Sequence, residues 1–337
     1  MPIFGPTQTL VISADSPDPD AIALAAEVIR RGGLVAFATE TVYGLGADAT
    51  SPRAVARIFE AKGRPETNPL IVHLDSIESA RPVAATWPDL AEALGTRFWP
   101  GPLTLVLPRA RGVADAVTAG GPNVAIRVPR PMVARDLIAR SGLPIAAPSA
   151  NRSLGISPTL ARHVAKDLAG RIDLILDSGP TAVGLESTVL DLTTARPSIL
   201  RPGTIRPDDL APILGFVPSV VGRATETGPA SSPGLSPVHY APRTPTFRAT
   251  LDELEAYPRP GLAGLLLIGR PARRAGPAFA HRIELLTPDF AEPSFYDALH
   301  RLDEQGLEAI LIVAPPDEPT WAAIRDRLAR AARPLGA

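Results

Sequence analysis

The stretch AKGRPETNPLIVH, residues 61–73, sets a lysine, an arginine and an asparagine in a loop that leads into an apolar run ending in a histidine. Gly63 lets the backbone approach a ligand closely, and the two prolines fix φ within the loop. Lys62 is a compact positive charge, whereas Arg64 carries a planar fork that matches phosphate or carboxylate oxygens. The stretch predicts a stiff loop for an oxyanion-rich ligand such as a nucleotide, with a solvated surface turn as the alternative.

Helical and apolar segments alternate around this loop. Residues 18–31 and 52–61 have the spacing of amphipathic helices, and 34–37, 70–74 and 172–176 are short apolar runs typical of buried strands. Polar residues follow these runs at their ends. The pattern therefore predicts an α/β domain whose strand ends share one cleft.

Hydroxyl groups and one carboxylate follow the run 34–37, on Thr39, Glu40, Thr41 and Tyr43. The nearby Gly44 and Gly46 formally match a dinucleotide-binding fingerprint. We reject that match because the glycines come several residues after the strand, and no acidic residue closes a second strand about 20 residues on. The group predicts either a ligand-contacting strand end or a polar turn.

Arg127 stands inside the apolar run 123–129. An unpaired buried charge costs several kcal/mol, so this cation needs a partner, either a bound carboxylate or a structural acid. His73, at the end of its run, is more often a hydrogen-bonded structural residue than a ligand-binding one. Ser157 precedes Pro158 and Thr159 and is expected to open the next helix as its cap.

The second part of the chain changes character. Prolines recur between 202 and 245, which predicts a semi-extended linker. Beyond it, strands at 261–268 and 309–313 and helices at 294–305 and 320–332 predict a small Rossmann-like β/α domain. Its strand ends carry little reactive chemistry, so we do not expect catalysis there.

Composition excludes several classes of protein. The 337 residues include no cysteine, which rules out disulfides, thiolate metal sites and a cysteine nucleophile. A net charge of -1 gives no support to extended nucleic-acid binding. No apolar run approaches the roughly 18 residues of a membrane span, and the N-terminus lacks a signal peptide, so we expect a cytoplasmic protein. Lysine is rare, with only Lys62 and Lys166 among 34 cationic residues.

Seven motifs in order then carry a resemblance: TETVYGLGADA (39–49), AKGRPETNPLIVH (61–73), FWPGPLTLVL (98–107), VAIRVP (124–129), APSANRS with SPT (147–159), GLESTVLD (184–191) and ILRPG (199–203). Together they resemble the YrdC-like family. The segment SPGLSPVHYAP (232–242) and the residues after it resemble the two-domain branch of that family, the threonylcarbamoyl-adenylate synthases. The resemblance implies a YrdC-like twisted mixed sheet with flanking helices at 14–203, a linker or lid at 204–245, and a smaller Rossmann-like α/β domain at 246–337.

The resemblance also implies an activity. Family members consume ATP, L-threonine and bicarbonate with Mg²⁺, release pyrophosphate and form an adenylate that other proteins use to modify tRNA adenosine beside the anticodon. It implies catalytic roles for Lys62 and Arg64, and no metal ligand from the protein. The implied ATP-binding residues are Lys62, Arg64, Asn68, Asn123, Ser149, Asn151, Ser157, Arg201 and Tyr240. The implied threonine-binding residues are Thr41, His73, Arg127, Ala147 and Ser187.

The chain departs from the family pattern in places. Ala38 replaces a usual proline, and 235–238 replaces a usual methionine, basic and aromatic run, which puts cationic linker contacts to the nucleotide in doubt. The segment 319–321 lacks expected glycines. The linker either folds over the cleft through 232–242, or His239 and Tyr240 dock on the C-terminal domain.

Two other functions compete with the synthase. A double-stranded RNA-binding module is opposed by the near-neutral charge. A carbamoyl-transfer enzyme of the hydrogenase-maturation kind would carry cysteine motifs that are absent.

Overall fold

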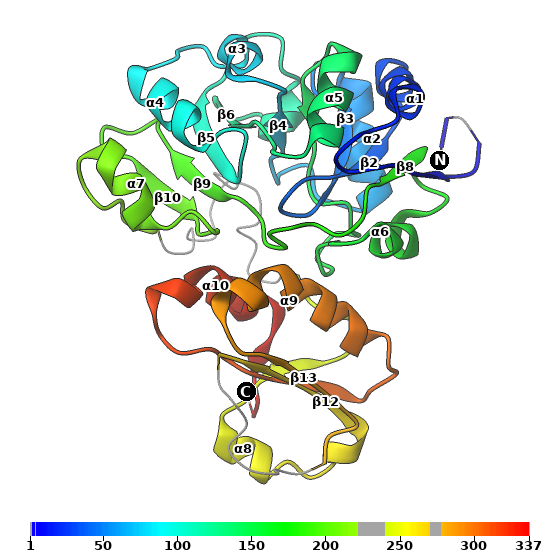
Figure 1. Ribbon diagram of the computed structural model, residues 1–337, viewed down its shortest axis with the longest axis vertical. Helices are drawn as coiled ribbons and strands as arrows, with labels where there is room; N and C mark the ends of the chain where they lie inside the picture. Colours follow the sequence, from blue (N-terminus) through cyan, green and yellow to red (C-terminus); the bar gives the residue numbers. More distant parts are fainter. Residues whose placement is uncertain (1, 4, 222–239, 270–277, 337) are drawn as a thin grey trace. The chain divides into compact units, whose positions relative to one another are not determined.

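The computed structural model describes residues 2–3, 5–221, 240–269 and 278–336, which divide into two compact units (Figure 1). Of these, the first unit holds the residues up to Ser153, Pro158–Ala182 and the residues from Glu186 to 221. The second unit holds the residues from 240 onward and also takes in two short stretches from the first half of the chain, Leu154–Ser157 and Val183–Leu185.

The first unit is built on a ten-stranded mixed sheet with the order β1-β8-β2-β3-β7-β4-β6-β5-β9-β10. The strands are β1 (Gln8–Val11), β2 (Val35–Ala38), β3 (Tyr43–Asp48), β4 (Ile71–His73), β5 (Leu103–Pro108), β6 (Asn123–Arg127), β7 (Ile145–Ala146), β8 (Leu174–Asp177), β9 (Thr188–Asp191) and β10 (Ser198–Arg201). Parallel pairs such as β4 with β6 alternate with antiparallel pairs such as β5 with β6. The expected mixed sheet with flanking helices is confirmed.

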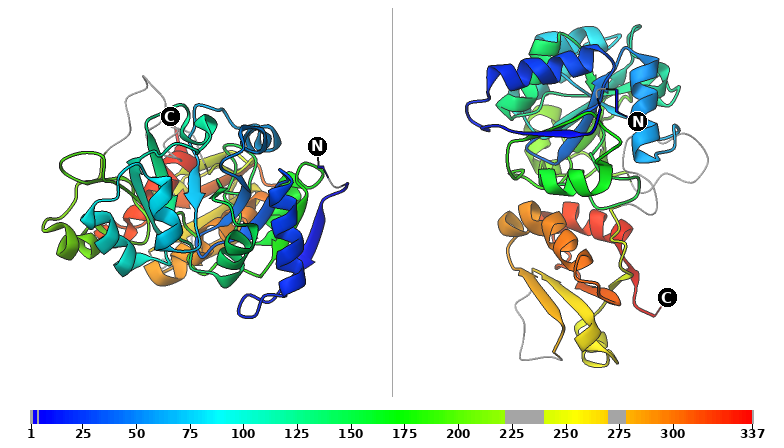
Figure 2. Two further views of the ribbon diagram at one scale, coloured as in Figure 1. Left: turned by 90° about the horizontal axis from the view of Figure 1, so that it is seen from above. Right: turned by 90° about the vertical axis from the view of Figure 1, so that its right-hand side faces the viewer.

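Helices cover both faces of this sheet, as the views from above and from the side show (Figure 2). Their bounds are α1 (Pro19–Arg30), α2 (Pro52–Lys62), α3 (Ile77–Ala80), α4 (Asp89–Phe98), α5 (Met132–Ser141), α6 (Ala161–Leu168) and α7 (Pro207–Leu214). One apolar cluster joins α1 and α5 to β2 and β8. A larger cluster joins α2, α4, α6 and α7 to the other face.

A third, small cluster consists of strand residues alone. It comprises Ile71, Val106, Ala125, Val189 and Leu200, from β4, β5, β6, β9 and β10. Successive side chains of a strand point to opposite faces, so His73 shares the face of Ile71, and Arg127 shares the face of Ala125. The side chains of His73 and Arg127 therefore project from this face of the sheet.

The glycine-containing segment after Tyr43 forms a strand. At Gly46 a Cβ atom would lie 2.7 Å from Phe37 and 2.8 Å from Ile145, so the glycine permits close packing between β3 and its neighbours. This explains Gly46 without a nucleotide-binding turn.

The second unit contains a five-stranded parallel sheet with the order β13-β12-β14-β11-β15, covered by α9 and α10 on one face and by α8 on the other (Figure 1). The bounds are β11 (Thr246–Arg248), β12 (Ala263–Ile268), β13 (His281–Leu285), β14 (Ala309–Val313), β15 (Arg333–Pro334), α8 (Leu251–Glu255), α9 (Pro288–Asp303) and α10 (Ala322–Ala331). The predicted Rossmann-like architecture is confirmed. Helix α9 begins at Pro288, earlier than the expected 294, and contains Pro293.

Two local predictions are wrong. Ser157 caps no helix, because α6 begins at Ala161 with Leu160 at its N-cap and no side-chain cap hydrogen bond. The start of the expected linker is helical rather than semi-extended, since α7 occupies Pro207–Leu214 with a proline at its first turn, where the missing N–H costs nothing. Residues 222–239, which include most of the expected lid, lie outside the described part of the chain.

No helix of the described residues has the length and apolar character needed to cross a membrane.

Candidate active site

Lys62 is the last residue of α2 and is almost fully buried, with 1% of its surface exposed. Gly63 ends the helix in the left-handed conformation with φ of 62°, which favours glycine. The Lys62 ammonium donates to the carbonyl oxygen of Ser149 at 2.6 Å and to that of Asn151. Burial, reinforced by the positive charges of Arg64 and Arg152, holds the pKa of Lys62 well below its usual range. An anion bound here would favour the charged ammonium and raise the pKa of Lys62 again.

Arg64 and Asn68 form the rest of this loop. The Arg64 guanidinium donates from Nε to the Asn68 carbonyl at 3.2 Å and from Nη2 to the Pro69 carbonyl at 3.0 Å. These bonds fix its fork in place before any ligand binds. The Asn68 side-chain oxygen is buried and has no hydrogen-bond partner among the described residues. The two cations of this loop are therefore buried, not the surface cations of the alternative.

Arg127 ends β6 and is held from three sides. Its Nη2 lies 2.9 Å from Glu40 Oε2, its Nη1 donates to Thr41 Oγ1 at 2.9 Å, and its Nε donates to the Gly101 carbonyl at 3.2 Å. The structural acid that the sequence left as one of two alternatives is thus Glu40. A bound carboxylate remains compatible with this partner, because a guanidinium has five N–H donors.

Ser187 lies just before β9 and is fully buried. Its hydroxyl lies 2.7 Å from the hydroxyl of Thr104, and Arg201 donates to both the carbonyl and the hydroxyl of Ser187 at 3.0 and 3.1 Å. Arg201 and Ser187, expected to contact ATP and threonine respectively, are therefore direct neighbours.

The residues around Lys62 and those around Arg127 are linked through contacts at the start of β3. Gly44 in β3 forms an isolated bridge with Ser149, and the Ala150 amide donates to the Tyr43 carbonyl at 2.8 Å. Thr41, the partner of Arg127, lies two residues before Tyr43. The segment 149–151, whose carbonyl oxygens hold Lys62, thus lies beside the start of β3, next to the turn that holds Thr41.

Ala147 and Asn123 both lie near the start of β4. The Ala147 amide donates to the Ile71 carbonyl at 2.9 Å. Asn123 begins β6, where the register of Ala125 with Ile71 places it level with the entry of the 61–73 loop into β4. Asn123 is half-buried and lies at the opposite end of its strand from Arg127.

His73 pairs with Arg127 across β4 and β6. Its Nδ1 lies 3.2 Å from the Ile71 carbonyl, and its ring meets Phe37 edge-on at 6.4 Å between centroids. Burial, with the nearby Arg127 charge, lowers the pKa of His73 to about 3. The ring is therefore neutral at physiological pH and suited to hydrogen bonding rather than to holding an anion.

Two predicted ATP-binding residues belong to the second unit. The Ser157 carbonyl lies 3.2 Å from His300 Nε2. Tyr240 is 1% exposed, packs against Tyr296 with 5.6 Å between ring centroids, and lies under the Arg327 guanidinium at 5.5 Å. Tyr240 thus packs on residues of the second unit, and His239, the other residue of that linker alternative, lies outside the described residues.

Sequence reasoning missed Thr104 and did not assign Glu40 a role. Thr104 is a single hydroxyl residue within the apolar strand Leu103–Pro108, and that exception was a usable signal. The sequence places Glu40 only in a polar cluster after the run 34–37. Its pairing with Arg127 joins residues far apart in the chain, which no local pattern reveals.

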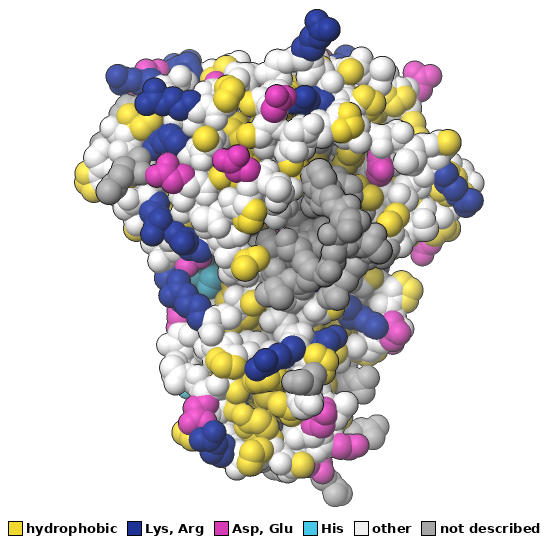
Figure 3. Space-filling view, turned by 180° about the vertical axis from the view of Figure 1, so that it is seen from behind, with side chains coloured by type: hydrophobic (Ala, Val, Ile, Leu, Met, Phe, Trp, Pro, Cys, Tyr) yellow, Lys and Arg dark blue, Asp and Glu magenta, His cyan; other side chains and the backbone are white. Residues whose placement is uncertain are grey.

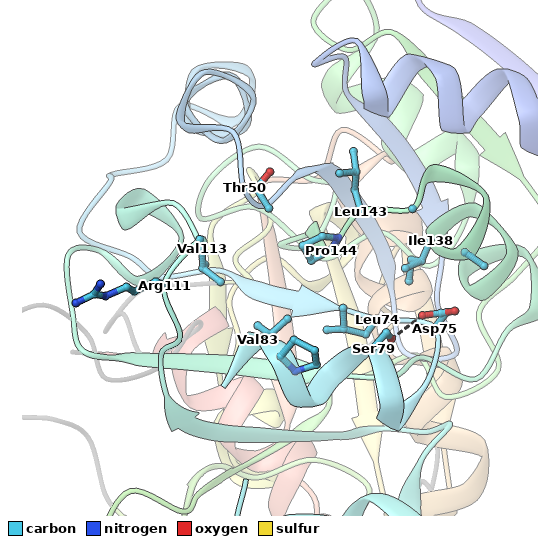
Figure 4. Close-up of a pocket in the computed structure, with 14 residues that line it drawn as sticks. Thr50, Leu74, Asp75, Ser79, Val83, Arg111, Val113, Ile138, Leu143 and Pro144 are labelled. Carbon is cyan, nitrogen blue, oxygen red and sulfur yellow. Dashed lines mark hydrogen bonds between the residues drawn. The ribbon is translucent and has the colours of Figure 1, made fainter. Parts of the chain in front are cut away.

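A separate cavity of about 450 Å³ lies in the first unit (Figure 4). Its wall is largely apolar, with Leu74, Val83, Val113, Ile138, Leu143 and Pro144, and the Ser79 hydroxyl donates to Asp75 at 2.6 Å on one side. Its lining includes none of the predicted site residues, so it is distinct from the candidate active site.

Cationic and anionic side chains are interspersed on the face drawn in Figure 3, in keeping with the net charge of -1. Within the described ranges, no group of three or more His, Asp or Glu side chains is arranged to hold a metal ion.

Comparison with known proteins agrees with this architecture. The Sua5/YciO/YrdC family model, described as "Telomere recombination", matches residues 27–203, and a model described as "Threonylcarbamoyl-AMP synthase, C-terminal domain" matches 205–333. Threonylcarbamoyl-AMP synthases of Pyrococcus abyssi and Bacillus subtilis are each 41% identical to this chain, over 92% and 94% of it and 93% of their own lengths.

Solved structures give the same result. The crystal structure of P. abyssi Sua5 complexed with L-threonine superposes with a TM-score of 0.88 at 36% identity, covering 98% of this chain and 100% of that one. Escherichia coli YciO, at 23% identity and a TM-score of 0.52, shares the fold over 58% of this chain and 96% of its own. The resemblance found in the seven motifs is confirmed. The chain belongs to the family of threonylcarbamoyl-AMP synthases that join a YrdC-like domain to a second, C-terminal domain.

Proposed function

We propose that this enzyme converts L-threonine, bicarbonate and ATP into threonylcarbamoyl-AMP, pyrophosphate and water. The observation that carries the proposal is the meeting, at one end of β3, of a buried lysine loop suited to phosphate and a buried arginine suited to a carboxylate. Full-length similarity to named synthases supports it. The competing RNA-binding function finds no support in these names.

The Lys62 loop serves as the phosphate side of the site. The carboxylate of N-carboxythreonine attacks the α-phosphorus of ATP, and pyrophosphate leaves, so negative charge grows on phosphoryl oxygens. Pre-fixed cations stabilise such charge without reorganising during the reaction. Lys62 and Arg64, each already held by backbone carbonyls, are placed for this role, with Asn68, Ser149 and Asn151 beside them. Arg201, which holds Ser187, is a further proposed contact of ATP.

The Arg127 group serves as the amino-acid side. Arg127 offers its remaining N–H donors to the threonine carboxylate, as a guanidinium commonly does. Thr41, Ser187 and the neutral His73 supply hydrogen bonds to the rest of the amino acid. No side-chain nucleophile is needed, since both new bonds are formed by substrate atoms.

The proposal also includes a metal ion, a route for the product and a compartment. Mg²⁺ enters as the ATP complex, because this ion commonly keeps water and phosphate oxygens as ligands. The adenylate would pass to proteins that transfer the threonylcarbamoyl group to tRNA, and the compartment would be the cytoplasm. Contacts of Ser157 and Tyr240 with ATP stay predictions.

Mass spectrometry of the products tests the proposal. The enzyme is incubated with ATP, Mg²⁺, bicarbonate and one amino acid at a time. We expect threonylcarbamoyl-AMP and pyrophosphate only when threonine and bicarbonate are both present. Pyrophosphate release at the same rate without either co-substrate contradicts the proposal.

A further inference from the structure

Only one of the two carboxylate oxygens of Glu40 has hydrogen-bonding or ion-pair partners among the described residues. Its Oε2 lies 2.9 Å from Arg127 Nη2 and accepts a hydrogen bond from the Arg130 amide at 3.0 Å. Both the Glu40 and Arg127 side chains are buried, with 3% and 4% exposed. These contacts leave the carboxylate little freedom to turn.

The second oxygen, Glu40 Oε1, is buried and has no hydrogen-bond partner among the described residues. Arg127 Nη2, although close to Oε2, is not aligned with it as a hydrogen-bond donor. An ionised carboxylate can accept about four hydrogen bonds, and a buried acceptor without a partner costs about 1–3 kcal/mol or more when charged. A purely structural ion pair would be expected to satisfy both oxygens.

We propose that Glu40 Oε1 accepts the α-ammonium group of the amino-acid substrate while Arg127 holds its carboxylate. This rests on the proposed function and names the part of the site that recognises the amino group. The two charges of an α-amino acid are separated by one carbon atom, and the two charges of the pair lie 2.9 Å apart. A buried pair with no net charge fits a zwitterion, which also has none.

The arrangement also suits the product of the first step. N-carboxylation joins the threonine nitrogen to the bicarbonate carbon with loss of one water molecule and one proton, which leaves one hydrogen on the nitrogen. The same donor can therefore stay on Glu40 Oε1 while the new carboxylate reaches toward ATP. Glu40 therefore selects amino acids with a free α-amino group and keeps that nitrogen in place.

Direct binding to L-threonine and to (R)-β-hydroxybutyrate, which lacks only the α-amino group, tests the inference by calorimetry. We expect the wild type to bind threonine at least about 30-fold more tightly, since a hydrogen bond to a charged group contributes about 2 kcal/mol. Glu40→Gln replaces the carboxylate by a neutral amide of the same shape. In this variant the preference should fall below about 3-fold.

Asp173→Asn is the matched control. Asp173 is also a buried acid paired with an arginine, Arg57, at 3.1 Å, but it bonds the Leu34 amide, at the other end of β2 from Glu40. This variant should keep the wild-type preference.

The outcomes separate the two ideas. Equal binding of both ligands by the wild type overturns the inference without any variant, and so does a Glu40→Gln protein that keeps the full preference. A wild type that does not bind threonine at all overturns the proposed function, and the inference with it.

Discussion

Lys62 Nζ donates a hydrogen bond to the carbonyl oxygen of Ser149 at 2.6 Å, joining two motifs that lie 87 positions apart. The bond aims a buried ammonium at the turn that follows β7. Because two carbonyl oxygens hold the ammonium, its position is fixed before a phosphate arrives. Such pre-organisation is what makes a cation effective in a transition state.

Lys62→Ala should lower kcat by at least about 100-fold, or about 2.7 kcal/mol, while ATP affinity falls less. Steady-state kinetics of pyrophosphate release and direct ATP binding measure the two effects. The chain offers a matched control, because its only other lysine, Lys166, is exposed on α6. Lys166→Ala should keep wild-type turnover. Normal turnover in Lys62→Ala would remove this residue from the mechanism.

ATP binding should take up a proton at Lys62. Burial holds the pKa of the free lysine below its usual range, and a bound polyphosphate raises it again. Between those two pKa values the ligand-free ammonium is partly deprotonated and the bound one is protonated. Calorimetry at a series of pH values, in buffers of different ionisation enthalpy, measures the uptake. Lys62→Arg should abolish it, since arginine stays protonated. Equal uptake by both proteins would place the proton elsewhere.

Arg127→Leu should raise the KM for threonine by at least about 100-fold and change the KM for ATP by less than about 3-fold. The leucine also leaves Glu40 buried without its partner, which costs stability. The double variant Glu40→Gln with Arg127→Leu removes that charge and should recover folding but not threonine affinity. If both KM values rise equally, the pair is a structural element whose loss disturbs the whole site.

The pKa of His73 predicts a dependence of stability on pH. Its pKa of about 3 lies below the 6.5 of an unfolded histidine, so between these values the unfolded chain binds more protons than the folded one. The free energy of unfolding should therefore rise with pH across this window, by up to about 1.4 kcal/mol per pH unit from this residue.

Urea unfolding of the wild type and of His73→Gln, at several pH values within that window, isolates the effect of the histidine. Carboxyl groups that titrate in the same range affect both proteins alike. The difference in unfolding free energy between the two proteins should change with pH. A constant difference would mean that folded His73 titrates normally.

The sequence predicted the parts of the site that are contiguous in the chain. Gly63, Lys62 and Arg64 follow one another, so turn chemistry and charge in a single loop were sufficient. For Arg127 the need for a partner could be predicted, because a charge in an apolar strand requires one. The identity of that partner could not, since Glu40 reaches Arg127 only after β2 and β6 take their places in the sheet.

Prolines were a poor guide to where helices begin and end in this chain. Pro293 was expected to precede a helix, but it lies inside α9. In α7 the same residue type occupies the first turn of a helix and a position inside it, in a segment expected to be extended. Proline restricts φ and removes one donor, but the remaining contacts of a helix decide whether it forms.

Gly203, which closes the motif ILRPG, should be required for the position of Ser187. A Cβ atom at Gly203 would lie 2.4 Å from the Thr188 amide nitrogen and 2.8 Å from the Glu186 carbonyl oxygen. Both contacts are with backbone, which cannot turn aside as a flexible side chain can. Gly203→Ala should therefore push the segment 186–188 away and loosen the bond between the Thr104 and Ser187 hydroxyls.

We expect Gly203→Ala to lower the unfolding free energy by about 1–3 kcal/mol and to raise the KM for threonine more than the KM for ATP. Gly261→Ala is the control, because a Cβ there meets nothing within 4 Å and φ is not in the left-handed region. That variant should match the wild type in unfolding and kinetics. If Gly203→Ala loses stability but keeps its threonine KM, the packing at this glycine supports the fold without setting the position of Ser187.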